Sequence, residues 1–140
     1  MNFLPEADQE YLRSKGISYV LVTEIGPDGK ESSRGVIFPS FEVPSNLRAQ
    51  QNGSLVVCQR CELLVMILPG YATTKLDNFY SIPHLKRPDG TDPQNATGVP
   101  TFFGRPWQFW SRHLPDSEWR VGKDGLSTFL SYIHNELRIA

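Results

Sequence analysis

The chain has 140 residues and a formal net charge of -1 at pH 7, with 39% hydrophobic and 21% charged residues. These totals are typical of a single globular domain, 1–140, and exclude a disordered chain. They also exclude a strongly basic nucleic-acid-binding surface, and the longest apolar run is far below the roughly 20 residues that a membrane helix needs. Because there are two cysteines and no secretory leader pattern, we expect a cytoplasmic protein.

The first elements are a helix and a β-hairpin. A short helix is predicted for residues 5–15, because Pro5 suits a first helical position, acidic residues follow it and a glycine stands at the end. Residues 17–25 and 34–41 are rich in β-branched and aromatic side chains, and a Gly-Pro-Asp-Gly turn lies between them. The sequence therefore predicts two antiparallel strands directly after the helix.

The middle of the chain carries further strand patterns. Residues 43–53 show little periodicity and predict a connection. Residues 55–58 and 63–68 predict strand, and Pro69-Gly70 ends the second of these stretches abruptly. Residues 79–82 are a short fourth extended piece.

A long loop and a tryptophan-rich segment precede the last element. Residues 83–106 are rich in Pro, Gly, Asp and Asn, and loops of such length in compact domains are usually functional or disordered. The spacing of Trp107 and Trp110 predicts a short helix that buries an aromatic face. Apolar side chains at helical intervals predict a closing helix over about 125–138, with Asp124 as a candidate cap.

This order of elements predicts an α+β fold. It consists of an N-terminal helix, a four-stranded antiparallel meander, a long loop with a short aromatic helix, and a C-terminal helix. We expect the helices to pack against one face of the sheet.

Three stretches of the chain resemble a known family: FLPEADQEYLRSKGISY, LLVMILPGY and FGRPWQFWSRHLPDSEWRVGKDGLSTFL. With the order of elements, they are similar to the ubiquitin-conjugating (UBC) fold of the UBC/RWD superfamily, and most closely to its bacterial branch, prokaryotic family E. That family's proline–tyrosine turn after the third strand is matched by Pro69-Gly70-Tyr71, and its tryptophan before the closing helix by Trp119. The resemblance implies a UBC-like fold, with a ubiquitin-like modifier, a ThiF-like activating enzyme and a JAB-type peptidase as pathway partners, in a conjugation or antiphage setting.

The chain departs from the family at the site of catalysis. Conjugating enzymes carry the modifier as a thioester on a cysteine after the fourth strand, whereas Cys58 and Cys61 both precede the Pro-Gly-Tyr turn. The stretch Pro83-His84-Leu85 stands where the family has His-Pro-Asn, and it lacks the asparagine amide that would stabilise an oxyanion. We therefore expect a UBC-like protein that binds the modifier, the activating enzyme or both, without the usual catalytic cysteine.

A hydroxyl nucleophile is the alternative, in which the modifier would be held as an oxyester. Ser111 with His113 as its base, or Thr101 with His84 or His113, are the candidate catalytic groups. A helix over 107–114 would point Ser111 and His113 in different directions. A third interpretation is an RWD-type interaction domain unconnected to any modifier.

A partner-binding surface is predicted around the tyrosine of the turn, the long loop and the outward side of the tryptophan segment. In the predicted short helix, Gln108, Ser111 and Arg112 would face outward. The residues expected to contact a partner are Tyr71, His84, Trp107, Gln108, Trp110 and Arg112.

The two cysteines have the spacing of half a zinc site. A structural zinc site needs four ligands, and no second pair of cysteines exists to complete it. The chain's three histidines could in principle complete one, but their spacing does not support this. We predict that Cys58 and Cys61 are small buried hydrophobic residues, and we expect no metal or cofactor.

Overall fold

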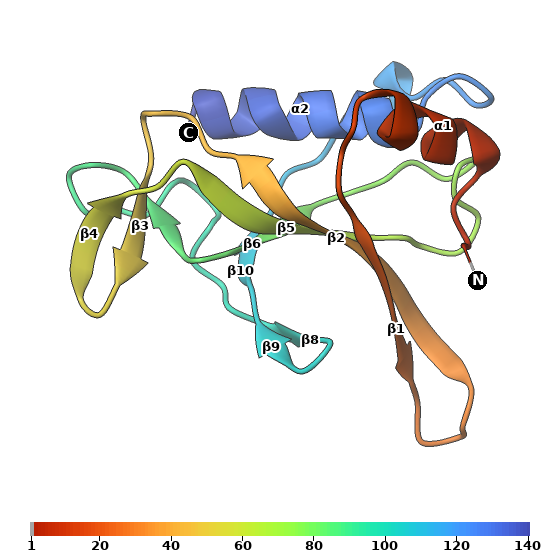
Figure 1. The fold of residues 1–140 in the computed structure, drawn as a ribbon, viewed down its shortest axis with the longest axis horizontal. Coiled ribbons are helices and arrows are strands. Elements are labelled where there is room, and N and C mark those ends of the chain that lie inside the picture. The colour runs from red at the N-terminus through yellow and green to blue at the C-terminus, as the bar shows by residue number, and fades with distance from the viewer. Residues whose placement is uncertain (1) are drawn as a thin grey trace.

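A five-stranded antiparallel sheet in the order β1–β2–β5–β6–β10 forms the centre of the molecule (Figure 1). The structure, a computed structural model, describes residues 2–140. The strands are β1 (Val20–Ile25), β2 (Glu31–Glu42), β5 (Arg60–Met66), β6 (Phe79–Ile82) and β10 (Gln108–Trp110). Because the first four of them pair in chain order, the predicted α+β class and the four-stranded meander are confirmed.

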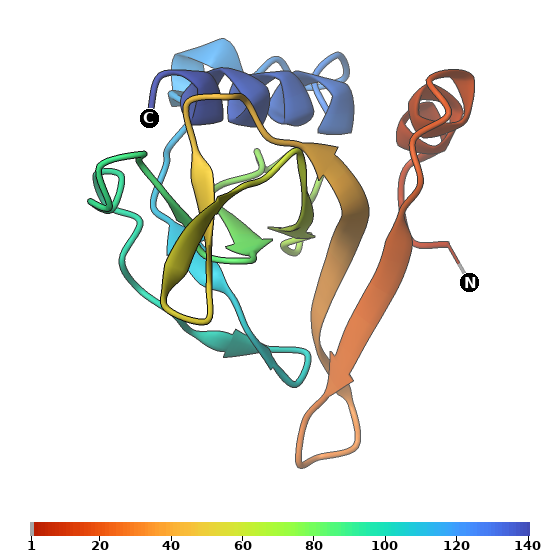
Figure 2. The same ribbon diagram turned by 60° about the vertical axis from the view of Figure 1, so that its left-hand side comes forward.

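Both helices lie on one face of this sheet, as the two ribbon views show (Figures 1 and 2). They are α1 (Glu6–Ser14) and α2 (Leu126–Arg138), so both predicted helices are present. The apolar side of α2 is buried, because its hydrophobic residues recur every three or four positions and form one stripe. Its buried residues are Leu126, Phe129, Leu130, Ile133 and Leu137.

The two helices are joined through a carboxylate. Asp8 of α1 is 6% exposed, and its Oδ1 accepts the Leu126 N–H at the start of α2 at 3.1 Å. Its Oδ2 accepts the Tyr71 hydroxyl at 2.6 Å. The predicted cap, Asp124, instead accepts the backbone N–H of Arg120 and the hydroxyl of Thr128, so it shapes the turn before α2.

A small three-stranded sheet, ordered β4–β3–β7, joins the hairpin that follows β2 in the chain to the short strand that follows β6. It contains β3 (Arg48–Gln51), β4 (Ser54–Val57) and β7 (Leu85–Lys86), with β4 and β7 at its two edges. The prediction that 43–53 is only a connection was wrong. Asn52 and Gly53 both have positive φ, as a tight hairpin turn requires, and they join β3 to β4.

The long loop is ordered and partly built of strands. After β7 it contains the hairpin of β8 (Thr101–Phe102) and β9 (Arg105–Pro106), which lies on the side of the main sheet opposite the helices (Figure 1). There Phe102 packs edge-on against Tyr80, with ring centroids 5.1 Å apart. Both faces of the main sheet are therefore covered.

The predicted short aromatic helix was wrong, because Gln108–Trp110 is strand β10. It pairs with the free edge of β6, placing Phe109 opposite Tyr80 and Trp110 opposite Phe79. Residues an odd number of positions apart in a strand point to opposite faces. Trp107 and Trp110 are accordingly both fully buried, but they belong to the two different cores on either side of the sheet. After the strand comes a single turn of 3-10 helix, Asp116–Glu118.

Candidate functional site

The two cysteines differ in burial: Cys61 is buried as predicted, whereas Cys58 is only partly buried, so the prediction for Cys58 was wrong. Cys61 lies in β5 and is 3% exposed, and burial raises the pKa of its thiol to about 12. The Cys58 thiol donates to the Arg60 carbonyl oxygen at 3.0 Å, and partial burial raises its pKa as well. Because the attacking species is a thiolate, both environments oppose thioester formation.

The stretch after β6 is held by one buried glutamine. Gln108 Oε1 accepts the Leu85 N–H at 2.7 Å and the Ser81 hydroxyl at 3.0 Å. Its Nε2 donates to the carbonyl oxygens of Leu85 and Ala96, each at 2.9 Å. The prediction that Gln108 faces outward was wrong, since it is 2% exposed and it fixes the start of the long loop against the sheet.

His84 is paired within the long loop. Its Nε2 lies 2.8 Å from Asp92 Oδ1, and Lys86 Nζ lies 3.6 Å from the same oxygen. The hydrogen bond from His84 and the nearby Lys86 charge lower the pKa of Asp92. This arrangement stabilises the loop and occupies one of the two ring nitrogens of His84.

A groove of about 440 Å³ lies where the chain leaves β10 and passes the C-terminal half of α2. We call it the Ser111 groove. The Ser111 N–H donates to the Asn95 carbonyl oxygen at 3.0 Å, which ties this segment to the long loop. The groove is lined by Arg87, Gln94, Asn95, Ser111, Arg112, His113, Tyr132, Glu136, Ile139 and Ala140.

Within the Ser111 groove, His113 is held by a carboxylate. Its Nδ1 lies 3.0 Å and 3.1 Å from the two oxygens of Asp77. A carboxylate at Nδ1 orients the ring and leaves Nε2 as the nitrogen that could take up a proton. Ser111 and His113 line the same groove in a stretch that is not helical, so the expected divergence of the two side chains does not apply. The structure records no hydrogen bond between them in the part of the chain it describes.

Arg112 connects β10 to α2. Its guanidinium lies over the Trp110 ring, 5.3 Å from the centroid, and its Nε is 3.2 Å from Glu136 Oε1. Its Nη1 donates to the Gln94 carbonyl oxygen at 2.6 Å. Burial, followed by the charge of Glu136, raises the pKa of Tyr132 to about 12. On the side of α2, the groove is therefore lined by the ion pair of Glu136 with Arg112 and by the uncharged Tyr132 side chain.

The other candidate residues lie apart from the Ser111 groove. Thr101 is exposed on β8, on the side of the sheet opposite α2, so the structure does not bring it to His113 (Figure 1). Tyr71 is half-buried and donates to Asp8, and its ring packs at a tilt against Trp119 with centroids 6.3 Å apart. Trp107 and Trp110 contribute no exposed surface.

Sequence reasoning missed Asp77 and Glu136. Asp77 lies 36 residues before His113 in the chain, and no spacing rule connects residues so far apart. Glu136 lies on a helix whose apolar stripe was recognised while its polar side was not assigned. Both become visible only when α2, the turn before β6 and the exit of β10 are placed together.

Two features are absent from residues 2–140, the part of the chain that the structure describes. These residues contain no group of three or more His, Cys, Asp or Glu side chains that could hold a metal ion. None of the helices in this part of the chain is both long and apolar enough to cross a membrane.

Comparison with known proteins gives one match. The model of the family described as Prokaryotic E2 family E matches residues 4–140. Neither the curated proteins nor the solved structures gave a match.

Proposed function

The chain belongs to prokaryotic E2 family E, and from this membership we propose that it binds a ubiquitin-like modifier, a ThiF-like activating enzyme or both, without carrying the modifier on a cysteine. The observation that supports this is the environment of the two sulfurs. Cys61 is buried in β5, and Cys58 is hydrogen-bonded at the end of β4. A JAB-type peptidase would act in the same pathway, in a conjugation or antiphage setting.

A second candidate function is supported by the Ser111 groove. Ser111 would attack the acyl carbon at the modifier's C-terminus, delivered as an acyl-adenylate, while His113 Nε2 takes the hydroxyl proton. The new bond is an oxyester, and the leaving group is AMP. The contact between His113 and Asp77 favours this candidate over one based on Thr101, which lies on β8 and does not line the Ser111 groove.

Incubation with purified modifier, activating enzyme and ATP separates these functions. Under the first proposal the chain co-elutes with one or both proteins and forms no covalent adduct. An adduct that resists thiols, is cleaved by hydroxylamine and disappears in Ser111→Ala supports the oxyester function. The control is Ser117→Ala, which removes an exposed hydroxyl from the single turn of 3-10 helix.

Two outcomes would contradict both candidates. A thiol-sensitive adduct that is lost in Cys58→Ala or Cys61→Ala would show that a sulfur is reached after all. Failure to bind either protein would leave the interaction domain of the RWD type.

A further inference from the structure

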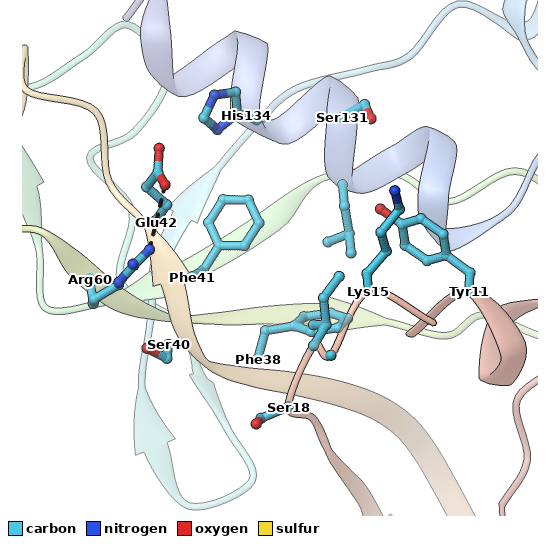
Figure 3. Close-up of a pocket in the computed structure, with 13 residues that line it drawn as sticks. Tyr11, Lys15, Ser18, Phe38, Ser40, Phe41, Glu42, Arg60, Ser131 and His134 are labelled. Carbon is cyan, nitrogen blue, oxygen red and sulfur yellow. Dashed lines mark ion pairs between the residues drawn. The ribbon is translucent and has the colours of Figure 1, made fainter. Parts of the chain in front are cut away.

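A second groove lies between the two helices, and none of its lining residues belongs to the Ser111 groove. We call it the interhelix groove (Figure 3). It has a volume of about 710 Å³ and is bounded by α1, α2 and the last part of β2. Its floor is apolar, because Phe38 and Leu130 are 1% and 5% exposed and Phe41 lies beside them.

The strand at the bottom of the interhelix groove has an open edge. β1 pairs with β2 only as far as Val20 opposite Ile37, whereas β5 continues to pair with β2 up to Glu42. The chain just before β1 does not fill the gap, because Ile17 donates its N–H to Leu12 of α1. Just beyond Phe38 this edge contains Pro39, which has no backbone N–H, and the pairing of β2 with β5 shifts register between Phe38 and Phe41. The part of the edge that can pair with an extended peptide is therefore the short stretch after Pro39.

The charged groups of the groove are mainly basic. Its lining contains Lys15 and Arg60 against a single carboxylate, Glu42, and also includes His134. Arg60 lies 3.6 Å from Glu42, so these two charges largely offset each other (Figure 3). Within residues 2–140, no ion pair is recorded for Lys15, which directly follows α1. An occupant with negative charge would therefore be complementary to Lys15, and His134 of α2 could form a hydrogen bond with it.

From these three features we propose that the interhelix groove binds an extended acidic segment of a partner protein. The segment would pair with the edge of β2 from Ser40 onward, place a large apolar side chain over Phe41, and direct a carboxylate toward Lys15. The inference goes beyond the proposed function, because it requires neither a modifier nor an activating enzyme.

The test measures binding of labelled octapeptides to the full chain by fluorescence anisotropy. The acidic probe is Gly-Asp-Val-Asp-Leu-Asp-Val-Gly. One comparison peptide has Lys in place of each Asp, and another has Ser in place of each Val and Leu. We expect saturable binding of the acidic probe and much weaker binding of both comparison peptides.

Two changes test the roles of charge and strand pairing separately. Lys15→Glu should weaken binding of the acidic probe by roughly three- to tenfold, as expected for a solvent-screened charge contact that becomes repulsive. The matched control Lys30→Glu makes the same change in the turn between β1 and β2 and should have no effect. Two further probes carry N-methyl groups on either the odd-numbered or the even-numbered backbone nitrogens. Because only one of these sets of amides faces β2, one methylated peptide should lose binding and the other should keep it.

Several results would overturn the proposal. These are no saturable binding of the acidic probe, equal binding of the basic peptide, equal loss in Lys15→Glu and Lys30→Glu, or full affinity of both methylated peptides. Self-association that Lys15→Glu abolishes would assign the groove to a second copy of the chain. Binding of anionic lipid vesicles without peptide binding would assign it to a membrane surface.

Discussion

Replacing Asp8 by alanine tests whether one carboxylate joins α1, the turn at Tyr71 and the start of α2. In the native protein it accepts the Tyr71 hydroxyl at 2.6 Å and the Leu126 N–H at 3.1 Å. Burial and the adjacent Asp8 carboxylate raise the pKa of Tyr71, so its hydroxyl stays protonated and keeps donating. Asp8→Ala removes both acceptors and leaves two donors in a largely buried position.

The expected loss can be estimated from the two contacts. Losing a helix cap costs about 1 kcal/mol, within a range of about 0.5–2. Losing a hydrogen bond to a charged group costs about 1.5–3 kcal/mol. We therefore expect Asp8→Ala to lower the free energy of unfolding by about 2–5 kcal/mol. Asp8→Asn keeps an oxygen acceptor of the same shape and should cost less.

Urea unfolding followed by tryptophan fluorescence measures this change. With a slope of about 2 kcal/mol per M, the midpoint of Asp8→Ala should fall by about 1–2.5 M, while the exposed control Glu6→Ala should stay close to the native value. A double-mutant cycle with Tyr71→Phe should show coupling between the two side chains. A loss below about 0.5 kcal/mol for Asp8→Ala, or additive effects in the cycle, would refute the inferred role.

Three further predictions follow from the buried polar and thiol groups. Gln108→Ala leaves buried backbone groups of the long loop unpaired, so it should lower the free energy of unfolding by about 2–4 kcal/mol. Urea unfolding measures this change, and a midpoint close to the native value would contradict the prediction. The Arg120 contacts lower the pKa of Asp124 to about 2, below its ordinary value near 4, so its stabilising effect should be lost as the pH falls from about 4 to 2. Asp124→Asn should therefore flatten the dependence of stability on pH in that range, and an unchanged slope would count against it. A thiol reagent should modify Cys58 in the native protein and should reach Cys61 only when the protein unfolds. Mass spectrometry can follow both reactions, and rapid modification of Cys61 in the native protein would contradict its burial.

Elements whose structure depends on residues close together in the chain could be predicted from local sequence patterns. The stripe on α2 predicted both the helix and its buried side, and β6 has the predicted bounds 79–82. The Asn52-Gly53 dipeptide is a strong hairpin signal, so β3 could have been predicted from it.

The tryptophan segment could not be assigned from spacing alone. Trp107 and Trp110 are three residues apart, which fits one face of a helix and equally fits two faces of a strand. The choice depends on the free edge of β6, and its residue Ser81 lies 27 positions before its partner Gln108. The same long-range pairing turned Gln108 inward. The contact between His113 and Asp77 likewise depends on tertiary placement.

The position of β10 also orders the assembly of the main sheet. β6 is complete at residue 82, but its outer neighbour begins at residue 108, after β7 and the β8–β9 hairpin. As the chain is synthesised, that side of β6 stays bare while the rest of the meander can already pair. The last strand of the sheet therefore arrives only after the whole long loop has closed, at the entropic cost that closing such a loop carries.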